Sequence, residues 1–230
     1  PGGQLELSGA PLTTAHEAAA ELAQHEQEVA TLSRQFGFLW LYVGRNPTIP
    51  SSRMPWMPKE RYAIMRRYLP TRGAQALDMM QGTGTVQSNF DYLNEADMAR
   101  KMRVAMAAAP FLTALFANSP FAEGKPTGML STRANVWTET DPDRCGFLDS
   151  VFQEDFGYQQ YVSYALDVPM FFIHRHGHYQ DLAGSSFRTF LKDGLGGEFP
   201  TQEDWSLHLS TLFPEVRLKN YIELRMADVG

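Results

Sequence analysis

Polar and apolar residues alternate with a period of two in three stretches of the chain, residues 3–8, 85–92 and 215–225. This period is the pattern of β-strands with one buried face. The polar faces consist of Gln4, Glu6 and Ser8; of Thr85, Gln87, Asn89 and Asp91; and of Arg217, Lys219, Tyr221, Glu223 and Arg225. If the three strands belong to one antiparallel sheet, these faces form a continuous polar surface.

This polar surface has two interpretations. It can be an ordinary solvated sheet face, or it can line a site for a magnesium–nucleotide complex. Carboxylates are the hard oxygen ligands that magnesium prefers, and arginines neutralise phosphate or a substrate carboxylate. The alternation alone leaves both interpretations open.

A helical period predicts helices near residues 15–35, 59–68, 95–118, 158–167, 182–191 and 202–212. Thr13 or Thr14 is expected to cap the first helix, and Thr201 the last, with Asp204 at the capping-box position. Pro110 is expected to split the helix that contains it. Apolar runs at 38–43 and 170–174 predict two further strands. The chain therefore has the element pattern of an α+β protein, in which the alternating strands can form an antiparallel sheet with one polar face.

Composition narrows the class of protein. Hydrophobic residues make up 43% of the 230 residues and charged residues 20%, which is ordinary for a globular domain. The net charge of −6 argues against nucleic acid as a partner, and no apolar run is long enough to cross a membrane. The single cysteine, Cys145, excludes an intrachain disulfide and favours a reducing compartment. We therefore expect a cytoplasmic protein.

Other candidate sites have weaker signals. His174, His176 and His178 alternate at an expected hairpin tip, where histidines are usually exposed and bind no metal. The turn at 82–85 lacks the lysine that a phosphate-binding loop requires. Long loops at 46–58 and 124–149 are candidates for covers over a site.

Eight motifs, taken together and in order, resemble glutamate–cysteine ligase of the plant and proteobacterial type. They are MPKERYAIMRRY at 57–68, DMM at 78–80, TVQSN at 85–89, ALFANSPF at 114–121, EGKP at 123–126, WTETD at 137–141, YALDVPM at 164–170 and FPEVRLK at 213–219. Each is weak alone, but the match extends over essentially the whole chain.

The resemblance implies a fold like that of glutamine synthetase: an antiparallel sheet curved into a funnel, with a polar concave face and helices outside. It also implies a reaction that uses ATP and Mg²⁺. The side-chain carboxylate of glutamate is phosphorylated, and the amine of cysteine attacks the acyl phosphate, in the first step of glutathione synthesis. The substrates glutamate and cysteine are then the expected partners.

The resemblance also implies roles for individual residues. Glu6 and Glu223 are expected to bind magnesium, and Gln87 and Asn89 to line the metal and nucleotide site. Arg225 is expected to face the transferred phosphoryl group, and Arg133 to hold a substrate carboxylate or phosphate. Trp137 and Tyr164 are candidates for the amino-acid pocket.

The chain begins and ends beside an expected strand. We therefore expect residues 1–230 to be a single catalytic domain truncated at both ends. The family has a further glutamate-rich strand before this point, and the isolated chain is expected to show little activity. Two alternatives stay open: a related carboxylate–amine ligase with a different amine acceptor, and a non-catalytic fragment.

Overall fold

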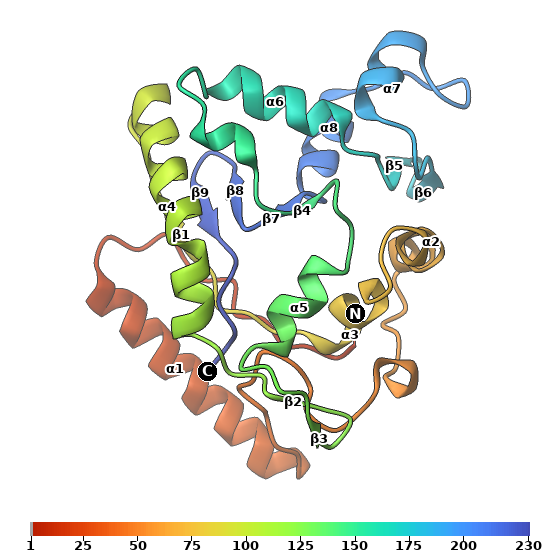
Figure 1. Ribbon diagram of the computed structural model, residues 1–230. Helices are drawn as coiled ribbons and strands as arrows, with labels where there is room; N and C mark the ends of the chain where they lie inside the picture. Colours follow the sequence, from red (N-terminus) through yellow and green to blue (C-terminus); the bar gives the residue numbers. More distant parts are fainter. Residues whose placement is uncertain (1) are drawn as a thin grey trace.

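Helices form most of the regular structure in the computed structural model, which describes residues 2–230 (Figure 1). The α-helices are α1 (Ala15–Phe36), α2 (Glu60–Tyr68), α3 (Ala76–Gly82), α4 (Glu95–Leu115), α5 (Thr132–Thr138), α6 (Tyr158–Asp167), α7 (Phe187–Asp193) and α8 (Gln202–Leu209). Short 3-10 helices are η1 (Ser51–Arg53), η2 (Leu69–Thr71) and η3 (Asp149–Phe152). Within the described residues no helix combines the length and the apolar character needed to span a bilayer.

The strands are short and form small sheets. They are β1 (Ser88–Phe90), β2 (Phe121–Ala122), β3 (Lys125–Pro126), β4 (Cys145–Gly146), β5 (Phe172–Arg175), β6 (His178–Asp181), β7 (Phe213–Pro214), β8 (Val216–Leu218) and β9 (Ile222–Leu224). The largest sheet is antiparallel, with the order β1-β9-β8. The pairs β2–β3 and β5–β6 are antiparallel, and β4–β7 is parallel. The α+β class is confirmed at this level, as a mixture of helices and small, mostly antiparallel sheets.

The register of the β1-β9-β8 sheet separates its two faces. Val216 pairs with Leu224 and Leu218 with Ile222, while Arg217 pairs with Glu223. Asn89 of β1 is the partner of Glu223 on its other side. The apolar face packs on α4, whose methionines fill the main core (Figure 1). That core includes Met98, Met102, Met106, Val151, Tyr161, Val216 and Ile222. The opposite face carries charged and amide groups, as the alternation predicts.

Local sequence signals fix the helix ends. The Thr14 hydroxyl accepts a hydrogen bond from the Glu17 backbone N–H, and the Glu17 side chain accepts one from Thr14 in return. Thr201 and Asp204 form the same capping box at α8. Both caps confirm the sequence prediction. Pro110 does not split α4, which runs unbroken from Glu95 to Leu115.

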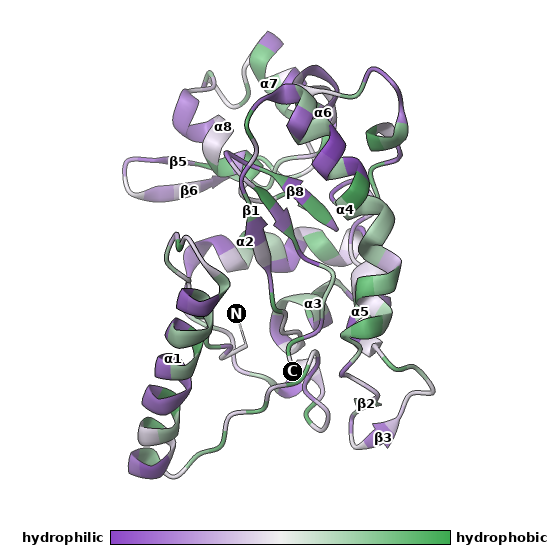
Figure 2. Cartoon of the chain, turned by 90° about the vertical axis from the view of Figure 1, so that its left-hand side faces the viewer, coloured by the Kyte–Doolittle hydropathy of each residue, from purple (hydrophilic) through white to green (hydrophobic). Residues whose placement is uncertain are grey.

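Several predicted strands differ in the structure. Residues 3–8 and 38–43 contain no strand, and their apolar side chains are largely exposed, with Leu39 at 87%. The strand at 85–92 is reduced to Ser88–Phe90, and 215–225 is a hairpin of β8 and β9 instead of one strand. The physical reason is pairing, because an alternating segment becomes a strand only where another strand accepts its backbone hydrogen bonds. In Figure 2, α1 stands apart from the sheet with hydrophilic and hydrophobic residues interleaved along it.

Candidate functional site

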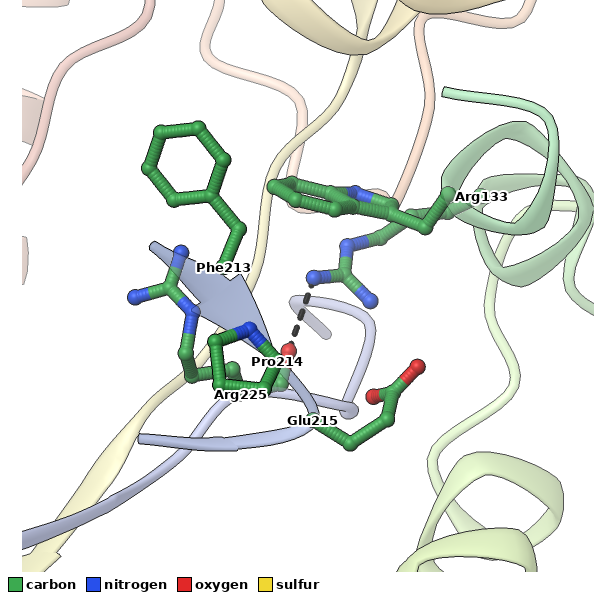
Figure 3. A pocket seen from close by; sticks show the side chains of 6 residues that line it. Arg133, Phe213, Pro214, Glu215 and Arg225 are labelled. Carbon is green, nitrogen blue, oxygen red and sulfur yellow. Dashed lines mark hydrogen bonds between the residues drawn. The ribbon is translucent and has the colours of Figure 1, made fainter. Parts of the chain in front are cut away.

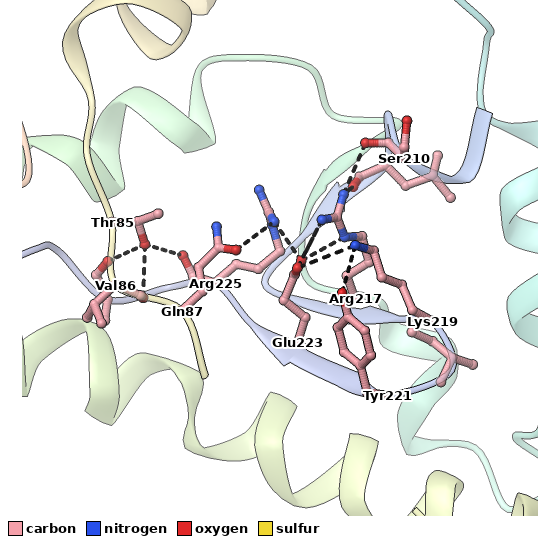
Figure 4. A network of polar contacts seen from close by, with 12 residues as sticks. Thr85, Val86, Gln87, Ser210, Arg217, Lys219, Tyr221, Glu223 and Arg225 are labelled. Carbon is pink, nitrogen blue, oxygen red and sulfur yellow. Dashed lines mark hydrogen bonds and ion pairs between the residues drawn. The ribbon is translucent and has the colours of Figure 1, made fainter. Parts of the chain in front are cut away.

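The polar face of the β8–β9 hairpin is organised around the carboxylate of Glu223 (Figure 4). Arg217 Nε donates to Glu223 Oε2 at 2.7 Å and Arg217 Nη2 to Oε1 at 3.1 Å. Arg225 Nη1 donates to Oε2 at 2.6 Å, and Lys219 Nζ lies 3.7 Å from Oε1. Three cationic side chains thus surround one buried carboxylate.

This surrounding charge determines the state of Glu223. Burial alone raises the pKa of a carboxyl group, but the hydrogen bond from Arg217 and the charges of Arg225 and Arg217 outweigh it, so the pKa of Glu223 is lowered. Glu223 is therefore ionised at neutral pH. Its oxygens are already used by charge-assisted hydrogen bonds.

Arg225 extends from the end of β9 toward α5. Its Nη1 lies 3.4 Å from Gln87 Oε1, and its guanidinium carbon lies 6.0 Å from the ring centre of Trp137 and 5.7 Å from that of Phe213. Burial and the neighbouring charge of Arg217 lower the pKa of Arg225. An arginine keeps its proton at neutral pH in proteins, so the group stays cationic, and its charge is poorly solvated.

Arg133 reaches the same place from α5. It donates from Nη1 to the Met226 carbonyl at 3.0 Å and from Nη2 to the Arg225 carbonyl at 2.8 Å, and it lies over the Trp137 ring at 5.5 Å. Burial lowers its pKa to about 10, so it too is charged at neutral pH. Two guanidinium groups therefore flank one indole.

Asp228 fixes α5 against the segment that follows β9. Its Oδ2 accepts from the Ser119 hydroxyl at 2.6 Å and from the Asn118 N–H at 2.9 Å, and its Oδ1 accepts from the Ser131 hydroxyl at 2.9 Å. Ser131 is the N-cap of α5, and Ser119 Oγ accepts from the Arg133 N–H at 3.0 Å. The start of α5, and with it Arg133, is held by this buried carboxylate.

A small pocket lies between these groups (Figure 3). It is lined by Arg133, Trp137, Phe213, Pro214, Glu215 and Arg225 and has a volume of about 10 Å³, which is room for about one water-sized group. Three buried N–H donors of its lining residues have no hydrogen-bond partner among residues 2–230: Arg133 Nε, Trp137 Nε1 and Arg225 Nε. Unpaired buried donors of this kind favour an anionic ligand, because a negative oxygen would satisfy them.

The structure brings some of the predicted site residues together. Arg133, Trp137 and Arg225 line the pocket, and Gln87 and Glu223 contact Arg225. Their proposed roles stay predictions.

Other predicted site residues lie elsewhere. Asn89 is exposed, although it pairs with Glu223 in the sheet. Tyr164 does not line the pocket, and its hydroxyl lies 3.4 Å from the Arg144 carbonyl oxygen, to which it donates.

The predicted magnesium site does not form in this arrangement. Glu6 is exposed, and nearby Gln4 is held at the end of α3 by the carbonyls of Met80 and Thr83, whereas Glu223 is buried among arginines. Within residues 2–230 no three His, Cys, Asp or Glu side chains gather to hold a metal. A divalent cation at Glu223 would have to displace bound guanidinium groups, so the residues present do not fit magnesium.

Sequence reasoning missed Glu215, Phe213 and Asp228. Glu215 has the same odd parity as Arg217, Glu223 and Arg225, and this alternation is the signal that could have found it. Phe213 and Asp228 gave no local signal, because their roles depend on contacts with α5.

Comparison with known proteins identifies the family. The sequence pattern of "Glutamate-cysteine ligase family 2 (GCS2)" matches residues 1–230. The chain belongs to glutamate–cysteine ligase family 2. The resemblance seen in the motifs is thereby confirmed.

Family members with curated names are similar over the whole chain. "Glutamate–cysteine ligase, chloroplastic" of Brassica juncea is 53% identical and that of Nicotiana tabacum 52%, each over 100% of this chain and 45% of the relative. "Glutamate–cysteine ligase B, chloroplastic" of Oryza sativa subsp. japonica is 52% identical over 100% of this chain and 47% of the relative. The chain spans about half the length of these relatives. Their names place them in the chloroplast, so the expectation of a cytoplasmic protein is wrong.

Proposed function

We propose that this chain contributes the arginine-lined part of the active site of an ATP-dependent glutamate–cysteine ligase. The reaction joins the γ-carboxylate of glutamate to the amine of cysteine through γ-glutamyl phosphate, the first step of glutathione biosynthesis. The observation that supports this most directly is the set of unpaired donors from Arg133, Trp137 and Arg225 around one pocket. Membership of the ligase family supplies the reaction class.

The chemistry requires negative groups to approach one another. A carboxylate oxygen of glutamate attacks the γ-phosphorus of ATP, and ADP leaves. The cysteine nitrogen then attacks the acyl carbon, phosphate leaves and the amine loses a proton. In the first step two anions repel each other, and fixed positive charge in a site of low solvation reduces that repulsion.

Arg225 is suited to this task because its position is fixed from several directions. Glu223 and Gln87 hold Nη1, and the two aromatic rings border the guanidinium. A charge held in advance needs no reorganisation when the phosphoryl group is transferred. Arg133 is fixed by the carbonyls of Met226 and Arg225 and offers its free Nε to the same ligand.

No step is assigned to magnesium, because Glu6 and Glu223, the residues expected to bind it, do not form a metal site among residues 2–230. We assign to this chain the binding and neutralisation of anionic groups, through Arg133, Arg225 and the indole N–H of Trp137. Gln87 orients Arg225, and Glu223 fixes it from the protein side.

The test is turnover by the full-length gene product with ATP, glutamate and cysteine, measured as ADP release and as γ-glutamylcysteine by mass spectrometry. Substituting Arg225→Ala should lower kcat/KM by about 10²–10³-fold if the guanidinium stabilises transferred charge. Arg100→Ala is the matched control, because Arg100 is 73% exposed and pairs only with Asp97 of its own helix. If the two variants have equal turnover, or if the unsubstituted protein forms no γ-glutamylcysteine, the proposal is wrong.

A further inference from the structure

Glu215 is half-buried and differs from the two buried carboxylates near the arginines, Glu223 and Asp228. Glu223 and Asp228 each accept several hydrogen bonds, whereas the Glu215 side chain accepts none from residues 2–230. Burial raises the pKa of Glu215, and the charges of Arg133 and Arg225 oppose this without making contact. A half-buried carboxylate with no donor from residues 2–230 is open to a donor that a ligand supplies.

The backbone around Glu215 is rigidly placed. The Glu215 N–H donates to the Gly146 carbonyl at 2.9 Å, and the Glu215 carbonyl accepts from the Arg225 N–H at 3.0 Å. The residue lies between β7 and β8, and its carboxylate lines the pocket on the side where the Arg133 guanidinium lies (Figure 3). The acid is therefore presented to the pocket by a fixed main chain.

The pocket thus has two unmet requirements of opposite kind. The N–H donors of Arg133, Trp137 and Arg225 have no acceptor, and the half-buried carboxylate of Glu215 lines the same pocket without a donor from residues 2–230. A phosphate or a simple carboxylic acid meets the first requirement and is repelled by Glu215. An α-amino acid meets both, because its carboxylate and ammonium groups lie on the same carbon.

We propose that Glu215 binds the ammonium group of an α-amino acid substrate and thereby selects amino acids over carboxylic acids that lack the amine. This inference rests on the proposed ligase function and adds a residue that determines specificity. The pocket has room for about one water-sized group in this structure, so binding of an amino acid requires the edge contact between Trp137 and Phe213, whose ring centres lie 5.9 Å apart, to open.

The test compares each substrate with the same molecule lacking its amine. In the full-length gene product, the Kd of glutamate is compared with that of glutarate, and the Kd of cysteine with that of 3-mercaptopropionate, all by calorimetry. The unsubstituted protein should bind at least one amino acid about 10-fold or more tightly than its analogue, since charged hydrogen bonds contribute this much. In Glu215→Gln that ratio should fall toward one, because the amino acid binds more weakly and the analogue does not.

The two pairs identify the ligand. A fall in the glutamate pair assigns Glu215 to glutamate, and a fall in the cysteine pair assigns it to cysteine. Ratios that stay unchanged in both pairs overturn the inference and leave the ligase proposal intact if γ-glutamylcysteine still forms. If the unsubstituted protein binds neither amino acid, both proposals fail.

Two further variants serve as controls for this experiment. Glu154→Gln removes one exposed negative charge elsewhere and should leave both ratios unchanged. Glu215→Asp keeps the charge on a shorter side chain and should give an intermediate ratio if the charge itself is recognised. Melting temperatures confirm that each variant is folded, and Glu215→Gln is expected to fold because it removes a poorly solvated charge.

Discussion

Arg217 and Glu223 lie opposite each other in the β8–β9 ladder, and their side chains are joined by hydrogen bonds of 2.7 and 3.1 Å. Arg217 also donates from Nη1 to the carbonyls of Ser210 and Leu212, each at 3.1 Å. This buried pair ties the hairpin to the segment after α8 and at the same time provides the carboxylate that holds Arg225. The same contacts therefore serve stability and the geometry of the proposed site.

Removing the carboxylate should be costly. Glu223→Ala leaves Arg217 and Arg225 buried without a counter-charge, and breaking a buried pair from one side typically costs about 3–5 kcal/mol. The free energy of unfolding from urea titration measures this. Glu154→Gln, an exposed control, should change the free energy by less than about 0.5 kcal/mol. A loss of less than about 1 kcal/mol in the free energy of unfolding of Glu223→Ala would contradict a stabilising role for the contacts of Glu223 with Arg217 and Arg225.

Trp137→Phe separates ligand binding from stability. The indole N–H has no partner among residues 2–230, so its removal should leave the free energy of unfolding unchanged or slightly raised, while the ring packing on Phe213 remains. If the N–H binds an anionic group of the ligand, the Kd of that ligand should rise about 3- to 10-fold. Calorimetry and thermal denaturation report the two effects. Unaltered affinity would exclude the N–H from the ligand site.

His208 should make the fold sensitive to acid. Burial, as the largest cause, lowers its pKa from 6.5 to about 4, and its Nε2 bonds the Ala165 carbonyl at 2.7 Å. The folded state therefore binds this proton less readily than the unfolded state. The contribution of His208 is fully present above pH 6.5 and is lost as the pH falls toward 4.

Urea denaturation across this pH range measures the free energy of unfolding. The pKa shift of His208 corresponds to a loss of about 3 kcal/mol at most in that free energy. His208→Gln cannot take up the proton, so its stability should fall less between these pH values. If the free energy of unfolding falls equally with pH in the unsubstituted protein and in His208→Gln, the predicted pKa shift of His208 is wrong.

Cys145 should be chemically inert in the folded protein. Burial raises the pKa of its thiol to about 12, so the thiolate that reacts with disulfide reagents is scarce near about pH 8. A thiol-reactive dye should label the native protein slowly and the urea-unfolded protein fast. Equal labelling rates in the two states would rule out this protection.

The alternation of residue types predicted the polar face correctly even though it predicted the wrong topology. Residues 215–225 were interpreted as one strand, but the hairpin pairs Arg217 with Glu223, and residues of equal parity stay on one face. Side chains alternate with a period of two on both sides of the turn. The same residues therefore share the polar face whether the segment is one strand or a hairpin.

Other features depended on partners that local sequence does not specify. Leu39 lies in an apolar run typical of a buried strand, yet it is exposed, because no described strand pairs with residues 38–43. Glu6 has the alternation of a strand residue and lies away from the sheet for the same reason. The carbonyls that fix Arg133 come from Met226 and Arg225, more than ninety residues away along the chain.

The backbone hydrogen bond between the Arg225 N–H and the Glu215 carbonyl joins the two ends of the β8–β9 hairpin at 3.0 Å. A carboxylate and a guanidinium group of the pocket lining are thus carried by the two ends of one hairpin. The backbone positions of Glu215 and Arg225 are therefore coupled, so a displacement of the hairpin would move the carboxylate and the guanidinium group together.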